Sequence, residues 1–123
     1  MNVLFLVAMV VEFIFAALFL LIPAPALALF GVSLDLTSTT MTRLFGSALL
    51  AFPVLLWYAS RTDSQDFKRS TVKTMFTYNL VVFILFTIAQ ANGLMNSFGW
   101  GAVILHLIFL IWFGYYLVQK PSS

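Results

Sequence analysis

Four long apolar runs dominate the sequence and limit what the chain can fold into. They cover about residues 3–22, 38–60, 72–91 and 100–118. A helix that rises ~1.5 Å per residue needs ~20 apolar residues to cross the ~30 Å hydrocarbon core of a bilayer. We therefore predict an all-α polytopic membrane protein, a single domain over residues 1–123 built as a bundle of four transmembrane helices.

The composition agrees with a chain that is solvated mainly by lipid. Of its residues, 63% are hydrophobic and 8% are charged, whereas about 25% of the residues of a soluble domain are charged. Six Lys and Arg residues are too few for a nucleic-acid surface, so nucleic acid is not an expected partner. The chain has no cysteine, which excludes disulfides and thiolate metal sites.

Proline and capping residues predict where the first two helices end, begin and bend. Pro23 and Pro25 should end the first helix, because proline cannot continue it. Ser38 or Thr39 can cap the second helix at its start. Pro53 lies inside that helix and predicts a kink.

The stretch between these helices should lie at one surface of the membrane. Residues 23–30 predict a short apolar turn or interfacial helix closed by Gly31, and residues 32–42 predict the one sizeable loop, where a lid can lie. Asp35 and Arg43 can form a salt bridge that pins this loop over the second helix. Such an exposed pair is worth under ~1 kcal/mol, so its expected role is structural.

The basic residues indicate the orientation of the chain. Arg43 lies at the opposite membrane surface from the other basic residues, which are Arg61, Lys68, Arg69, Lys73 and Lys120. Short cytoplasmic loops retain Lys and Arg. We therefore expect both termini to be cytoplasmic, with residues 61–73 as a solvated cytoplasmic connector. A bacterial cytoplasmic (inner) membrane is the expected location of this multi-pass chain.

Polar side chains inside the apolar runs are the best indication of a site. Glu12 lies near the middle of the first run, Asn79 and Gln90 share a stripe of the third helix, and His106 lies in the fourth. A charge at that depth costs at least ~2.5 to 3.5 kcal/mol, so Glu12 should face the bundle and find its partner in Asn79 or His106. These four residues either lock the register of the helices or bind a proton, a lipid head group or another polar ligand tip.

His106 is the one histidine of the chain. A neutral imidazole can supply one axial bond to a tetrapyrrole. A chlorophyll-type pigment on His106 is therefore a further hypothesis, whereas haem held by two histidines is excluded. One His and one distant Glu fall short of the usual three or four ligands of a metal ion, so we predict no metal site. No catalytic residue is assigned.

Small residues at helical spacing predict close helix contacts. Ala8 and Ala16 flank Glu12, four residues to either side, on the first helix. Ser47 and Ala51 form a small-xxx-small pair on the second helix. Such residues let helices approach closely in a membrane. We expect all of them to lie at helix contacts and not against lipid.

Several segments resemble those of small four-helix bacterial membrane proteins of unknown function, loosely the DoxX-like group. They are PAPALALFGVSLD, TRLFGSALLAFPVLLWYA, the basic loop that follows, and a third helix that ends in AQANG. The motifs are a proline-ended first helix, an outer LFG segment and an Arg-Leu-x-Gly entry into the second helix, here Arg43, Leu44, Phe45 and Gly46. The resemblance implies the fold and the membrane location, and it brings no catalytic residues.

Three functions from different classes remain open on the sequence. The first is a non-catalytic accessory subunit that packs against a larger membrane complex or against copies of itself, since the loops are short and no reaction centre is recognisable. The second is a small carrier or binding protein for a lipid-like molecule, with Glu12, Asn79 and His106 at the polar end of an apolar pocket. The third is a membrane enzyme that uses Glu12 and His106 as acid and base, although the sequence offers no nucleophile spaced with them.

Overall fold

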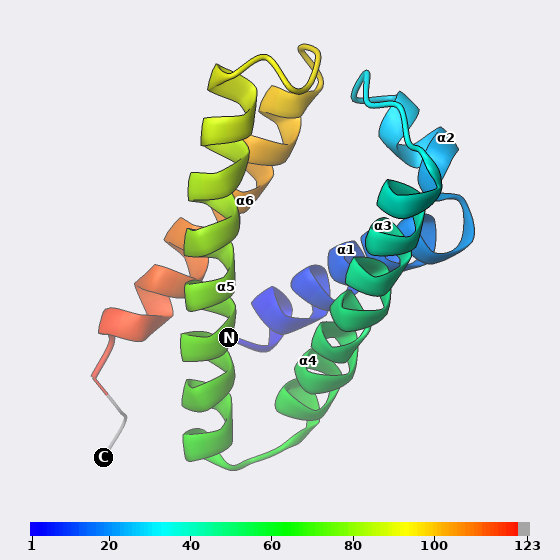
Figure 1. Cartoon of the computed structure of the whole chain (residues 1–123). Helices are drawn as coiled ribbons and strands as arrows, with labels where there is room; N and C mark the ends of the chain where they lie inside the picture. The colour runs from blue at the N-terminus through cyan, green and yellow to red at the C-terminus, as the bar shows by residue number, and fades with distance from the viewer. Residues whose placement is uncertain (121–123) are drawn as a thin grey trace.

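The computed structural model describes residues 1–120, which are all-helical apart from their connections (Figure 1). The helices are α1 (Asn2–Leu21), α2 (Pro23–Ala28), α3 (Leu36–Leu49), α4 (Ala51–Arg61), α5 (Gln65–Ala91) and α6 (Gly99–Val118). Four spans are long and apolar enough to cross a membrane: α1, α3 together with α4, α5, and α6. The predicted helical class and the four predicted spans are confirmed, and the predicted limits of α1 and α6 are right to within a residue.

Asp35 fixes the start of α3. The amide of Ser38 donates to Oδ1 of Asp35 at 2.7 Å, and Ser38 Oγ accepts from the Asp35 amide at 2.9 Å. This is a reciprocal capping box, and the bond from the Ser38 amide holds the pKa of the Asp35 carboxyl below its ordinary value. Arg43 donates from Nε to the carbonyl oxygen of Leu20 at 3.3 Å. The predicted salt bridge between Asp35 and Arg43 is therefore wrong. The Asp35 carboxylate accepts from Ser38, and the Arg43 guanidinium donates to the carbonyl of Leu20.

The connection from α1 to α3 is shorter than predicted. α2 is the short helix expected over residues 23–30, with Pro23 in its first turn. Proline is tolerated there, because amide hydrogens of the first turn make no hydrogen bond within the helix. Gly31 closes it with a φ of +74°, a conformation that favours glycine. Because α3 already begins at Leu36, the lid expected over residues 32–42 does not exist as a loop.

A one-residue break separates α3 from α4, at the place where Pro53 predicts a disturbance of the helix. Proline has no amide hydrogen to offer the carbonyl four residues earlier, here that of Leu49, and its ring crowds that carbonyl. The helix accordingly ends at Leu49 and resumes at Ala51. The intervening Leu50 still donates to the carbonyl of Gly46 at 3.3 Å, so the direction of the chain is largely kept.

α5 begins well before the predicted position. Its first residue is Gln65, and Ser64 caps it by accepting from the Phe67 amide at 3.3 Å. The expectation of a solvated connector over residues 61–73 is wrong for most of that stretch. The expectation followed hydropathy, which falls where Lys and Arg begin, but Gln, Lys and Arg are good helix formers. The helix therefore extends beyond its apolar part.

The helices form two groups that we call arms. The first arm is α1 to α4, in which α1 packs along both α3 and α4, and the second arm is α5 packed along α6. Direct contact between the arms is sparse and involves mainly α4 with α5 and α1 with α6. Figure 1 shows the arms joined at one end by the α4–α5 connection (residues 62–64), which we call the connection end. The opposite end, with the α5–α6 loop (residues 92–98), is the loop end.

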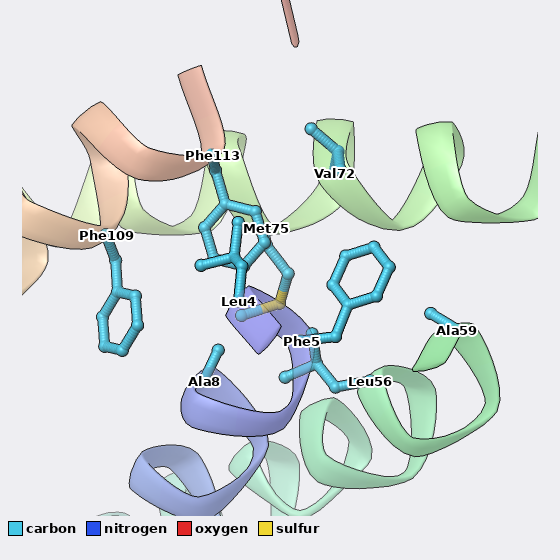
Figure 2. Close-up of a cluster of buried hydrophobic side chains, with 9 residues drawn as sticks. All are labelled: Leu4, Phe5, Ala8, Leu56, Ala59, Val72, Met75, Phe109 and Phe113. Carbon is cyan, nitrogen blue, oxygen red and sulfur yellow. The ribbon is translucent and has the colours of Figure 1, made fainter. Parts of the chain in front are cut away.

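A buried apolar core joins the arms toward the connection end. Every span contributes to it (Figure 2), and its members are Leu4, Phe5, Ala8, Leu56, Ala59, Val72, Met75, Phe109 and Phe113. A polar contact between the arms adds to it, because the terminal ammonium of Met1 donates to Tyr116 Oη at 2.9 Å. Within the second arm, Arg69 donates to the carbonyl of Gln119 at 3.0 Å. Packing of this kind holds helices together in lipid, so the two arms are packed together at the connection end.

Gly46, not Ser47 or Ala51, is the small residue at the contact between α3 and α1. A Cβ on Gly46 would lie 2.9 Å from Phe19 Cβ and 3.2 Å from the carbonyl oxygen of Ala16. Ala16 is fully buried there, and Ala8 is buried in the core, as predicted. Ser47 and Ala51 are exposed, so the contact predicted for them is wrong. The small-xxx-small spacing alone did not show which face of the helix turns inward.

Candidate binding cavity between the two arms

A cavity lies between the arms, on the loop-end side of the core. It holds about 600 Å³ of space free of protein atoms, part of it open to the surroundings. The lining is strongly aromatic, with Phe15, Phe19, Phe30, Phe45, Tyr78, Phe86 and Phe109. Its titratable side chains are Glu12 from α1, Tyr78 from α5 and His106 from α6.

His106 is held by Asn79 in a defined orientation. The side-chain amide of Asn79, which is fully buried, donates to the carbonyl oxygen of Met75 at 2.8 Å. This bond identifies the nitrogen of the amide, so its Oδ1 must be the atom that lies 3.0 Å from His106 Nδ1. An amide oxygen can only accept, hence Nδ1 of His106 carries a hydrogen. In the neutral ring, Nε2 is then left as an acceptor.

Glu12 is the carboxyl group of the cavity. The residue is 3% exposed and lies on the lining. Within residues 1–120 its carboxyl group makes no hydrogen bond, and Asn79 is engaged by Met75 and His106 instead. The predicted pairing of Glu12 with Asn79 or His106 is therefore wrong, although His106 does share the cavity with it. Removing a carboxyl group from water without a hydrogen-bond partner costs free energy. A ligand in the cavity can supply that partner.

Tyr78 is a site residue that the sequence analysis missed. Its ring stacks against Phe52 at 4.5 Å between centroids and meets the His106 ring edge-on at 6.0 Å. These contacts hold the side chain in the lining of the cavity. The sequence did contain a signal, because a tyrosine next to Asn79 in the middle of an apolar run lies far from the membrane surfaces where tyrosine is usually found.

Gln90 does not belong to the polar group of the cavity. Its Nε2 donates to the carbonyl of Asn96 at 3.0 Å, and its Oε1 is buried without a partner in the described part of the chain. The glycine at position 99 permits this arrangement, because a Cβ there would collide with Gln90 Oε1. Gln90 thus shapes the α5–α6 loop, and the cavity lining does not include this predicted ligand-binding residue.

The α5–α6 loop crosses to the first arm and bonds to it. Asn96 donates from its backbone amide to the carbonyl of Phe30 at 2.8 Å and from Nδ2 to the carbonyl of Leu29 at 3.0 Å. We call these two bonds the latch. No sequence pattern pointed to Asn96, since an asparagine in a loop is ordinary. The latch bounds the cavity at the loop end, as the core bounds it at the connection end.

The opening of the cavity therefore faces sideways, between the arms. Phe45 of α3 lines the cavity and is 42% exposed, so the cavity reaches the lateral surface beside that helix. In a membrane-spanning bundle this surface meets lipid. A ligand dissolved in the bilayer would have a direct route to Glu12.

The chemistry of the lining limits the groups that it can hold. Among the described residues, no cluster of three His, Cys, Asp or Glu side chains can hold a metal ion. His106 Nε2 is one axial ligand for a tetrapyrrole, but the lining includes no Lys or Arg to bind acidic ring substituents, so it does not favour haem. Glu12 and His106 share the lining and make no hydrogen bond to each other in the described chain.

Comparison of the chain with protein-family models, with curated proteins and with solved structures gave no significant match. The similarity to the DoxX-like group therefore rests on the sequence motifs alone, and the interpretation of the cavity rests on its own geometry.

Proposed function

We propose that this protein binds a small lipid-soluble molecule in the cavity between its arms, as a binding or carrier protein. The observation that carries the proposal is Glu12, a residue only 3% exposed whose carboxyl group lines a largely apolar and aromatic cavity and makes no hydrogen bond within the described chain. Burial of an unsatisfied polar group costs free energy, and a ligand with a polar tip would remove that cost while its apolar body fills the rest of the space.

This proposal has more support than an accessory role. Large apolar side chains are exposed along the outer faces of all four spans, for example Phe13, Leu85 and Ile111. Lipid covers such faces as well as a partner subunit would, so they do not favour a partner. A subunit role in a larger complex or a homo-oligomer stays a prediction. An enzymatic role for Glu12 and His106 also stays a prediction.

We place the chain in a bacterial inner membrane with both termini in the cytoplasm. The support is the group of basic residues at the connection end, from Arg61 to Lys73. In this orientation the cavity opens toward the outer leaflet. The cysteine-free chain permits a direct check, because a single cysteine at Lys68 should react with an impermeant maleimide only after the membrane is made permeable. Labelling of that cysteine in intact cells would reverse the orientation.

Photolabelling tests the proposed binding. The purified protein in lipid nanodiscs is irradiated with a neutral long-chain alcohol that carries a diazirine, and the labelled peptides are mapped by mass spectrometry. We expect adducts on lining residues such as Phe15 and Phe86 in addition to the lipid-facing surface. Ala102 lines the cavity, so Ala102→Trp should fill it and remove the lining adducts.

Ile104, on the same helix, is 53% exposed and outside the lining, so Ile104→Trp is the matched control and should leave the adducts in place. Adducts confined to the lipid-facing surface of the unmodified protein, or the same adducts in both variants, would overturn the proposal.

A further inference from the structure

The lining of the cavity offers negative potential and, in the described part of the chain, no positively charged Lys or Arg side chain. Its lining contains a single carboxyl group, that of Glu12, and no Lys or Arg among the described residues. The faces of aromatic rings carry negative potential and attract cations. Phe15, Phe19 and Phe45 form a continuous row of such rings, with centroids 6.0 Å apart for the first pair and 5.9 Å for the second.

Glu12 has no counter-ion within the described chain. The titratable side chains that share the cavity with it are Tyr78 and His106, and α3 contributes only Phe45 and Leu49 to the lining. His106 directs its Nδ1 hydrogen to the neutral amide of Asn79 and not to a carboxylate. Arg43, the basic residue of α3, donates to the carbonyl of Leu20. An ionised Glu12 would therefore need a cation from outside the protein.

That cation must carry its own apolar surface. A bare or hydrated metal ion needs several oxygen or nitrogen ligands, which the cavity does not provide. An anion would meet the carboxyl group and the negative ring faces. A cation whose charge is spread over apolar or aromatic groups would contact the rings with its body and Glu12 with its charge.

We propose that the cavity binds a lipophilic monocation in exchange for the proton of Glu12. This inference rests on the proposed binding function and names its ligand class. When the cation enters, the O–H bond of the Glu12 carboxylic acid breaks, its proton leaves to water, and the carboxylate balances the charge of the ligand. When a proton returns, the cation is released, so one proton and one monocation occupy Glu12 alternately.

A pair of ions of equal size and opposite charge tests the inference. Binding of tetraphenylphosphonium and of tetraphenylborate to the protein in neutral detergent is measured by titration calorimetry at several pH values and in buffers of different ionisation enthalpy. We expect the phosphonium to bind, to release one proton, and to gain about tenfold in affinity per pH unit while Glu12 is mostly protonated. Tetraphenylborate should not bind above its partition into detergent.

Two variants locate the effect. Glu12→Gln should lose about 30-fold or more in phosphonium affinity, as when one partner of a buried charge pair is removed. It should also lose the proton release, while keeping its melting temperature and the adducts of the neutral diazirine alcohol. Asp35→Asn makes the same change of acid to amide outside the cavity and should bind as the unmodified protein does.

The outcomes separate this inference from the proposed function. If the neutral alcohol labels the lining but both ions bind equally or the phosphonium releases no proton, the cation inference is overturned and the binding function stands. If no probe reaches the lining, the binding function itself fails.

Discussion

At the scale of single residues, the most informative feature is the chain of bonds from Met75 through Asn79 to His106. The carbonyl of Met75 fixes the amide of Asn79, and that amide fixes the ring of His106. The result is an imidazole whose Nδ1 is satisfied inside the protein, so that Nε2 is its free acceptor. Asn79 thus positions the ring, and Glu12 is left as the group that a ligand can engage.

Removal of Asn79 should destabilise the protein and free the His106 ring. Asn79→Ala deletes both bonds and leaves a buried donor on His106, a change that costs about 1 to 3 kcal/mol. The free energy of unfolding, measured by titration with a denaturing detergent, should fall by that amount. Asn92, which is exposed and makes no side-chain hydrogen bond in the described chain, gives the control Asn92→Ala. Equal stability of the two variants would contradict the role given to Asn79.

At the scale of helices, the close approach of α1 and α3 depends on the absence of a side chain at Gly46. The backbone of Ala16 and Leu20 lies within 3.2 Å and 3.0 Å of the place where a Cβ would stand. Backbone atoms cannot move aside as the end of a flexible side chain can. The first arm therefore has its present form only with glycine at this position.

Gly46→Ala should destabilise the protein by about 1 to 3 kcal/mol, the usual cost of overpacking, although alanine is the better helix former. Gly101, in α6, has open space within 4 Å of the place where its Cβ would stand, so Gly101→Ala serves as the control. It should be neutral or slightly stabilising. Thermal melting in detergent compares the two, and a Gly46→Ala variant that melts at the temperature of the unmodified protein would disprove the close contact.

The sequence predicted the helices better than it predicted their faces. Apolar length identified the spans, and Pro53 identified the break, because both effects are local to the backbone. The early start of α5 was missed because hydropathy measures where lipid begins and not where a helix begins. The contact at Gly46 was assigned instead to Ser47 and Ala51, since a helix in lipid is apolar all round and carries little information about which side is buried.

The same contrast between position along a helix and rotation about its axis explains why the site was predicted only in part. The depth of Glu12, Asn79 and His106 along their helices follows from counting residues, and two of them do form a hydrogen bond. The rotation of each helix does not follow from counting. Glu12 was therefore given a partner that it does not have, and Tyr78 was left out of the cavity that it lines.

At the scale of the whole molecule, the two arms are held together at both ends, with the cavity between them. The core closes the connection end, and the Asn96 latch closes the loop end. The latch consists of two hydrogen bonds, each worth about 0.5 to 1.5 kcal/mol net. It is thus much weaker than the core, so the loop end is the part that can open.

Asn96→Ala should loosen the loop end without unfolding the bundle. It removes the bond to Leu29 as well as the Oδ1 acceptor of the Phe98 amide, 3.0 Å away. Hydrogen exchange should become faster in residues 29–32 and 94–98 and stay unchanged in the core around Met75. Asn92→Ala, in the same loop, is the control. Unchanged exchange in both loop segments would show that the latch does not hold the arms.

The central claim is that the carboxyl group of Glu12 stands unpartnered in a cavity that is reached from the bilayer. Dicyclohexylcarbodiimide, a lipid-soluble reagent, adds to protonated carboxyl groups in apolar surroundings, and mass spectrometry of the treated protein shows which acid has reacted. We predict an adduct at Glu12 and none at Asp35, Asp63 or Asp66, with slower reaction when Ala102→Trp fills the cavity. A folded protein in which Glu12 stays unmodified, or reacts equally fast in the Ala102→Trp variant, would contradict the claim.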